Sequence, residues 1–372
     1  MAIAGRMSAR FAANNVAGVL IMPWFFAAMV LFTSTLAIAQ TATTKPAPLI
    51  DDEAYTHPQL MVQIERGRRL NLYCVGKGSP TVVFDSALGD DTSDWGLVQP
   101  KIAQATRACS YDRAGIGFSD PARRASSSIN IVDDLHRLLV ASHISPPYIM
   151  VGHSYGTLNV QLFAAHFPVE VVGMVLLDPQ PQEWMNDIKR LVPHWQTDEF
   201  EPKIAQRRAC VAESLAGFTP DSELYKKCVG GSDERFSDPI NAAHLTLYSR
   251  PAYQRALLSE DENVYGGISE DQVRDGRKSF GAMPLIVLTR SPNTSPLAPN
   301  ETAESRDAIY QAWVQRENEI ASLSSRGVNK VIPNTGHFIQ LQQPTAVIDA
   351  IDQVLNAAKE QQRMQASSSH AP

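Results

Sequence analysis

The sequence contains no long run of basic residues, no internal repeat and no glycine-rich phosphate loop. Gly115-Ile116-Gly117 lacks the third glycine and the helix context of a dinucleotide site, so no such site is indicated. Only 19% of the residues are charged and the formal net charge is −6, which gives no reason to expect nucleic acid as a partner. The 372 residues are 44% hydrophobic, a composition typical of a globular chain that buries a large core.

Cysteine is also scarce, with four residues that form no C-x-x-C motif: Cys74, Cys109, Cys210 and Cys228. The cysteine and histidine residues do not cluster in the sequence as the ligands of a metal site would, and we expect neither a metal nor another cofactor. In an exported chain, four cysteines permit two disulfides in any of three pairings. Four buried free thiols are the alternative interpretation.

The N-terminal region has the pattern of a targeting segment. Arg6 and Arg10 precede an apolar stretch over 16–39, which ends in Ala37-Ile38-Ala39. This pattern predicts a signal peptide over 1–39 and an exported protein, periplasmic or secreted. The stretch is also long enough to span a membrane, so a retained anchor is the alternative.

Strand and helix patterns alternate along most of the remaining chain. The sequence predicts strands at 60–65, 70–75, 81–85, 108–112, 147–151, 171–177, 285–289 and 328–332. It predicts helices at 95–105, 129–141, 157–166, 303–323 and 346–359. Such alternation is typical of a parallel sheet covered on both faces, an α/β fold.

Residues 180–283 interrupt this alternation, because they are rich in helical patterns and aromatic residues and show no clear strand. We interpret them as a helical cap inserted between two strands. The predicted organisation is a polar lead-in over 40–57, a first core part over 58–179, the cap, a second core part over 284–360 and a disordered tail over 361–372.

The most informative motif is Gly152-His153-Ser154-Tyr155-Gly156, which lies between an apolar strand pattern and a helix pattern. A serine between two glycines at such a turn is typical of a nucleophile elbow. The tight turn needs small neighbours, and the N-terminus of the following helix favours negative charge that develops nearby.

Together with this motif, two further segments and a late histidine carry a family resemblance. Asp112 to Ser119 looks like the D-x-R-G-x-G-x-S segment, Phe84 to Gly89 takes the place of the H-G-G-type loop, and Thr335-Gly336-His337 follows the last strand. From about Leu60 to Ala358 the chain resembles the α/β-hydrolase superfamily. The resemblance implies a mostly parallel eight-stranded sheet flanked by helices, with a helical cap after strand 6.

The resemblance also implies a catalytic set with Ser154 as nucleophile and His337 as base. The chain order Ser…Asp…His places the acid after the sixth or the seventh strand. Asp178 ends the sixth strand at the carboxyl edge of the sheet, and we favour it for that reason. The seventh strand has no carboxylate at its end, but later carboxylates stay open as alternatives: Glu301, Glu304 and Asp307.

The oxyanion hole is expected to use the backbone N–H groups of Tyr155 and Ala87, with Leu88 as the alternative to Ala87. Asp85-Ser86 stands where the family often has His-Gly, and a carboxylate there is expected to disfavour anionic substrates. Because the second and fourth strands are neighbours in this fold, the resemblance also favours the pairs Cys74–Cys109 and, within the cap, Cys210–Cys228.

The resulting hypothesis is a serine hydrolase that cleaves a carboxylic ester of an apolar or aryl small molecule through an acyl-enzyme on Ser154. A lactone, amide or carbon–carbon bond hydrolase with the same three residues is the alternative within this chemistry. A non-catalytic ligand-binding protein on the same scaffold is the alternative outside it. The sequence predicts neither the substrate nor the oligomeric state.

Overall fold

The computed structural model describes residues 47–276, 279–297 and 301–368. Eight strands form one sheet in the order β1-β2-β4-β3-β5-β6-β7-β8. Their bounds are β1 Leu60–Glu65, β2 Arg68–Val75, β3 Thr81–Asp85, β4 Ala108–Tyr111, β5 Tyr148–His153, β6 Val171–Leu177, β7 Leu285–Arg290 and β8 Gly327–Ile332. Strand β2 pairs antiparallel with β1 and β4, and all other pairs are parallel. The predicted mostly parallel sheet is confirmed.

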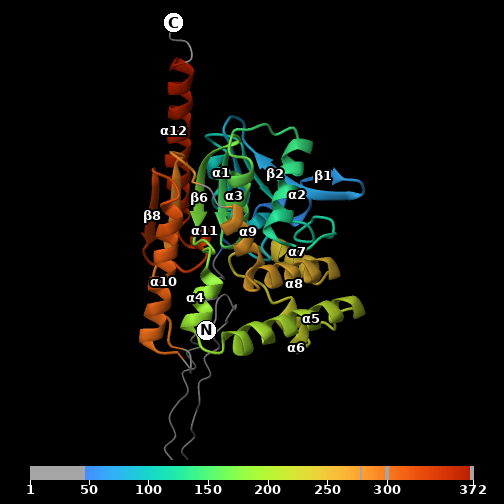
Figure 1. Ribbon diagram of the computed structural model, residues 1–372. Helices are drawn as coiled ribbons and strands as arrows, with labels where there is room; N and C mark the ends of the chain where they lie inside the picture. Colours follow the sequence, from blue (N-terminus) through green and yellow to red (C-terminus); the bar gives the residue numbers. More distant parts are fainter. Residues whose placement is uncertain (1–46, 277–278, 298–300, 369–372) are drawn as a thin grey trace, which may run out of the picture. The chain divides into compact units, whose positions relative to one another are not determined.

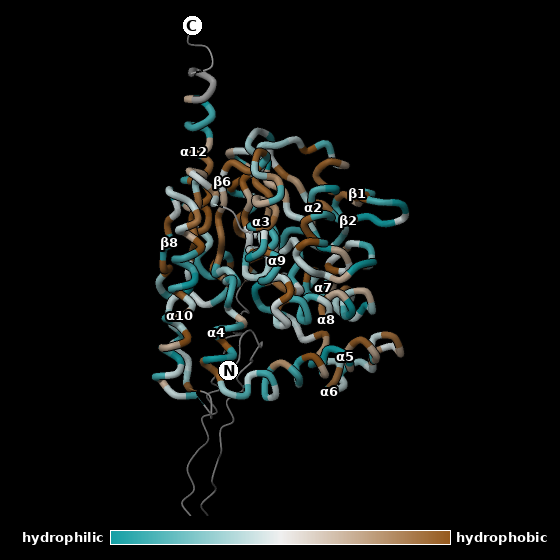
Figure 2. The backbone as a smooth tube through the Cα atoms, viewed as in Figure 1, coloured by the Kyte–Doolittle hydropathy of each residue, from teal (hydrophilic) through white to brown (hydrophobic). Residues whose placement is uncertain are grey.

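Helices cover both faces of this sheet (Figure 1). Those outside the segment between β6 and β7 are α1 Gln99–Ile102, α2 Ser128–Ala141, α3 Tyr155–His166, α10 Ala303–Ala321, α11 Ile339–Gln342 and α12 Pro344–Ser368. Successive residues of β5 point to opposite faces: Met150 packs in a core with α2 and α3, whereas Ile149 and Val151 pack in a second core with α12. Figure 2 accordingly shows apolar chain around β6 and a hydrophilic tip on the β1–β2 hairpin.

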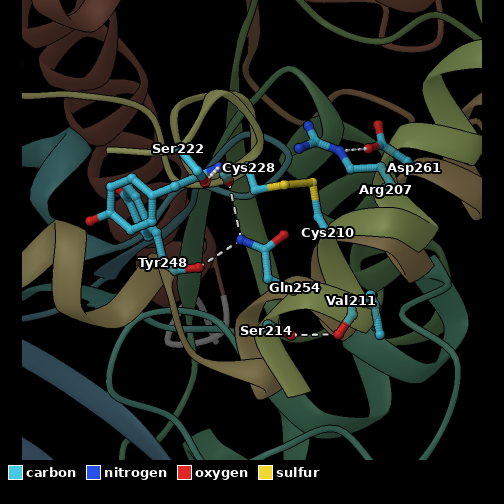
Figure 3. Close-up of a disulfide and its surroundings, with 10 residues drawn as sticks. Arg207, Cys210, Val211, Ser214, Ser222, Cys228, Tyr248, Gln254 and Asp261 are labelled. Atoms are coloured by element: carbon cyan, nitrogen blue, oxygen red, sulfur yellow. Dashed lines mark hydrogen bonds and ion pairs between the residues drawn. A yellow bond between two sulfur atoms is a disulfide. The ribbon is translucent and has the colours of Figure 1, made fainter. Parts of the chain in front are cut away.

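The segment between β6 and β7 is helical, as predicted for the cap, and its described residues contain no named strand. Its helices are α4 Trp184–Leu191, α5 Glu201–Ala216, α6 Glu223–Cys228, α7 Asp238–Tyr248, α8 Pro251–Tyr265 and α9 Ile268–Gly276. Figure 3 shows the disulfide Cys210–Cys228, which joins α5 to α6. Gln254 of α8 supports it, because its Nε2 donates to the carbonyl oxygens of Cys228 at 3.1 Å and Tyr248 at 2.6 Å.

The second disulfide, Cys74–Cys109, joins directly opposed residues of β2 and β4. Both predicted pairings are therefore confirmed, and all four cysteines of the sequence are paired.

Three local expectations were wrong. The helix expected over 95–105 is reduced to a 3₁₀ turn over Thr92–Trp95 and the short α1, because Pro100 fits only the first turn of a helix. The lead-in contributes to the core, since Ile50 and Tyr55 are each 97% buried in a cluster with Phe236 of the cap.

The C-terminal tail also differs from the expectation of disorder from residue 361. Helix α12 continues to Ser368, in a stretch rich in strong helix formers such as Ala, Lys, Glu and Gln. The predicted signal peptide over 1–39 and residues 40–46 of the lead-in lie outside the described residues. Within those that are described, no helix is both long and apolar enough to span a bilayer.

Candidate active site

Ser154 occupies a sharp turn between β5 and α3. Its backbone has φ +50° and ψ −114°, a conformation that is energetically unfavourable for any residue that carries a side chain. A Cβ atom at Gly156 would lie 2.2 Å from the carbonyl oxygen of Asp85, and one at Gly152 would lie 2.8 Å from backbone atoms of Gly156. The two glycines of the motif are therefore required by close backbone contact, as expected for an elbow.

His337 and Asp178 form a direct pair at the carboxyl edge of the sheet. His337 lies in the loop between β8 and α11, and its Nδ1 is 2.5 Å from Oδ2 of Asp178. Asp178 follows β6 directly and is fully buried, with φ +40°. The later carboxylates do not reach this pair: Glu301 binds Arg306, and Glu304 and Asp307 are exposed.

The Asp178 carboxylate accepts further hydrogen bonds from two neighbours. Arg290 donates through Nη1 at 2.6 Å to Oδ2 and through its backbone N at 3.2 Å to Oδ1. Trp313 of α10 donates its Nε1–H to Oδ1 at 3.0 Å. Burial alone would raise the pKa of Asp178, but the Arg290 charge and the His337 contact outweigh it and hold that pKa well below its usual range.

His153 brings the serine turn and the histidine loop together. Its Nε2 lies 2.7 Å from the carbonyl oxygen of His337, and its Nδ1 is 3.0 Å from Nε2 of Gln340. Burial and the proximity of His337 lower the pKa of His153 to about 3, so its ring is neutral at neutral pH. On the Asp178 side, the backbone N of Gln180 donates to the carbonyl oxygen of Ser154 at 3.3 Å. The three predicted residues Ser154, Asp178 and His337 thus meet at one sheet edge.

Two side-chain atoms at this edge, Ser154 Oγ and His337 Nε2, make no hydrogen bond within the described part of the chain.

The expected oxyanion donors also lack acceptors. The N–H groups of Ala87 and Tyr155, both buried, donate to no group of the described residues, and the same holds for Leu88. Arg113 fixes the loop that carries Ala87, because its Nη2 donates to the Ala87 carbonyl at 2.6 Å and its Nη1 to the Ser86 carbonyl at 2.7 Å. The loop that carries the Ala87 N–H group is thereby held in place, while this N–H group has no acceptor among the described residues.

Asp85, for which an effect on anionic substrates was expected, is turned into the protein. Its carboxylate is fully buried and accepts hydrogen bonds from Tyr111 Oη at 2.7 Å and Arg113 Nη1 at 2.8 Å. Burial raises the pKa of Asp85, although the Arg113 charge and the hydrogen bonds oppose the shift. Asp85 therefore supports the oxyanion loop instead of facing a ligand.

No sequence pattern indicated Glu260 of α8, which connects the cap to this loop. Glu260 is fully buried, lies 2.7 Å from Nε of Arg113 and accepts the Gly89 N–H at 2.7 Å. Arg113 was visible within the Asp112 to Ser119 motif, but nothing near Glu260 marked its partner.

One group of side chains has the spacing of metal ligands among the described residues. Asp90, Asp94 and His153 offer atoms that all lie within 4.8 Å of one another. Both ring nitrogens of His153 already contact other groups, the His337 carbonyl and the Gln340 amide. We therefore assign no metal to this group.

Comparisons with known proteins agree with this architecture. The model of the "Alpha/beta hydrolase family" matches residues 82–350. The chain is 36% identical to YqjL of Bacillus subtilis over 286 residues, which cover 77% of this chain and 87% of that protein. It is 32% identical to an "AB hydrolase superfamily protein" of Gibberella zeae over 299 residues, 75% of this chain and 87% of that protein.

Solved structures show the same fold at lower identity. Est816, described as an N-acyl homoserine lactone degrading enzyme, aligns with a TM-score of 0.53 at 18% identity, over 79% of this chain and 99% of that one. Family match, relatives and fold agree, and the chain belongs to the alpha/beta hydrolase family.

Proposed function

We propose that the protein is a serine hydrolase that cleaves carboxylic esters through an acyl-enzyme on Ser154. The observation that carries this proposal is the His337–Asp178 pair, held beside the strained Ser154 turn by the contact between His153 and the His337 backbone. Family membership supports hydrolysis, and the serine in the elbow supports an acyl intermediate rather than an aspartate-bound one.

In this mechanism, Asp178 keeps the proton of His337 on Nδ1, so that Nε2 presents a lone pair. His337 takes the proton of Ser154 Oγ as the oxygen attacks the ester carbonyl, and the Tyr155 and Ala87 N–H groups bind the oxyanion. The proton passes to the leaving alcohol as the C–O bond breaks. Water then attacks the acyl-enzyme, its proton goes to His337 and then to Ser154, and the carboxylic acid leaves.

A fluorophosphonate probe and a panel of p-nitrophenyl esters of graded chain length test this proposal, with an amide and a lactone as further substrates. We expect labelling and ester turnover by the wild type and by Ser295→Ala, an exposed serine in the loop after β7. Ser154→Ala should show neither. Folded wild type that stays unlabelled and turns over no substrate would instead favour a ligand-binding protein on this scaffold.

We also propose that the protein works in an oxidising compartment. Two disulfides support this, because such bonds persist mainly in exported proteins. Thiol-specific labelling of denatured protein from the native host tests it. Four blocked cysteines are expected, and four free thiols would contradict it.

A further inference from the structure

We propose that Arg290 is a positioning residue, which fixes the orientation of the Asp178 carboxylate and, through it, that of His337. The inference rests on the proposed function in that it assigns His337 the role of the base. It concerns the position at the end of β7, which the sequence leaves without a carboxylate.

Arg290 reaches the acid from the adjacent strand. Strands β6 and β7 are parallel neighbours, so the residues that end them lie side by side at the carboxyl edge. The Arg290 guanidinium binds Oδ2 of Asp178 at 2.6 Å and lies 4.3 Å from the Trp313 ring centre, and the Arg290 side chain is 18% exposed. Its backbone is held as well, because Tyr310 Oη donates to the Arg290 carbonyl at 3.1 Å. The guanidinium is therefore held between the Asp178 carboxylate and the Trp313 ring.

These contacts fill the hydrogen-bonding capacity of the carboxylate. Asp178 accepts from His337 Nδ1, Arg290 Nη1, the Arg290 backbone N and Trp313 Nε1, two donors on each oxygen. With all of its acceptor sites used, Asp178 has no freedom to rotate away from His337. Arg290 and Trp313 thus fix the orientation of the acid and, through it, that of the base.

The test is the proton resonance of the His337 Nδ1–H group, which donates to Asp178, observed by NMR in the full chain and assigned by its loss in His337→Gln. Arg290→Met removes the side-chain donor that holds Oδ2 of Asp178, and we expect the resonance to broaden or disappear as this proton exchanges with water. Arg290→Lys keeps a donor at this position and should restore most of the wild-type signal. Trp313→Phe removes the donor to Oδ1 and should weaken the resonance in the same direction.

In kinetics with one p-nitrophenyl ester, Arg290→Met should lower kcat by about tenfold and leave KM unchanged, because a misoriented base affects the reaction and not substrate binding. If that variant does not fold, Arg290→Gln replaces it with the same expected results. An unchanged Nδ1–H resonance in the folded variant would overturn the inference. Because the resonance needs no turnover, its result is separate from that of the proposed function, which fails only if folded wild type neither reacts with fluorophosphonate nor hydrolyses any substrate.

Discussion

Nε2 of His153 lies 2.7 Å from the carbonyl oxygen of His337, so the residue before the proposed nucleophile holds the backbone of the proposed base. The two residues are 184 positions apart in the chain. The ring can donate through Nε2 while its Nδ1 accepts from Gln340 only when it is neutral. The spacing between Ser154 and His337 therefore depends on the charge state of His153.

The first prediction concerns stability at acidic pH. The pKa of His153 is about 3 in the folded chain and about 6.5 when unfolded, so the unfolded state binds one more proton between these values. This group's contribution to stability is complete above pH 6.5 and falls by about 1.4 kcal/mol per pH unit as pH drops below it.

Urea unfolding of wild type and His153→Gln from pH 4 to pH 7.5 measures this contribution. The difference in unfolding free energy between the two proteins should shrink as pH falls. A difference that is constant across this range would show that His153 is not buried in its neutral form.

The second prediction separates the candidate acids. Asp178→Asn keeps the shape of the side chain but removes the charge that holds the His337 tautomer, so kcat should fall by roughly 10³- to 10⁴-fold. Asp307→Asn, at an exposed position of α10, should leave kcat within about twofold. Steady-state kinetics with one p-nitrophenyl ester compare them. Near-normal turnover by Asp178→Asn would contradict the assignment.

Local patterns in the sequence were sufficient to predict much of the fold and the candidate residues. The apolar run 171–177 became β6 at the predicted bounds, and the elbow motif became the strained turn at Ser154. Contacts between distant segments were not predictable in this way. Arg290 and Glu260 are single charged residues without a periodic or motif context, and only the folded chain shows that each faces a buried partner.

The third prediction concerns the connection between the cap and the oxyanion loop. Arg113 is 97% buried and pairs with two buried carboxylates, Asp85 and Glu260. Glu260→Gln removes one of them and leaves Asp85, so it should lower the free energy of unfolding by about 2 kcal/mol, less than the full cost of an uncompensated buried charge. It should also lower kcat/KM, since Glu260 accepts the Gly89 N–H next to the Ala87 donor.

The matched control for this change lies on the same helix. Glu262→Gln removes a partner of Arg208, but both of those side chains are substantially exposed, so unfolding should change by less than about 1 kcal/mol. Urea unfolding of the three proteins makes the comparison. Equal effects of the two substitutions would contradict a special role for the buried pair.

The fourth prediction concerns the distance between the two proposed oxyanion donors. Gly156 follows Tyr155 and touches the Asp85 and Ser86 carbonyls, which come just before Ala87, so this contact sets how closely the two loops approach. A Cβ atom at position 156 would lie 2.2 Å from the Asp85 oxygen, and the loops would have to separate. Gly156→Ala should cost about 3 kcal/mol of stability, as overpacking does, and lower kcat rather than raise KM.

The matched control is Gly231→Ala. Nothing lies within 4 Å of the carbon added there, so this change should alter stability by less than about 0.5 kcal/mol. Thermal unfolding and ester kinetics of both variants test the argument, and a stable, fully active Gly156→Ala protein would show that the donors are not spaced by this contact.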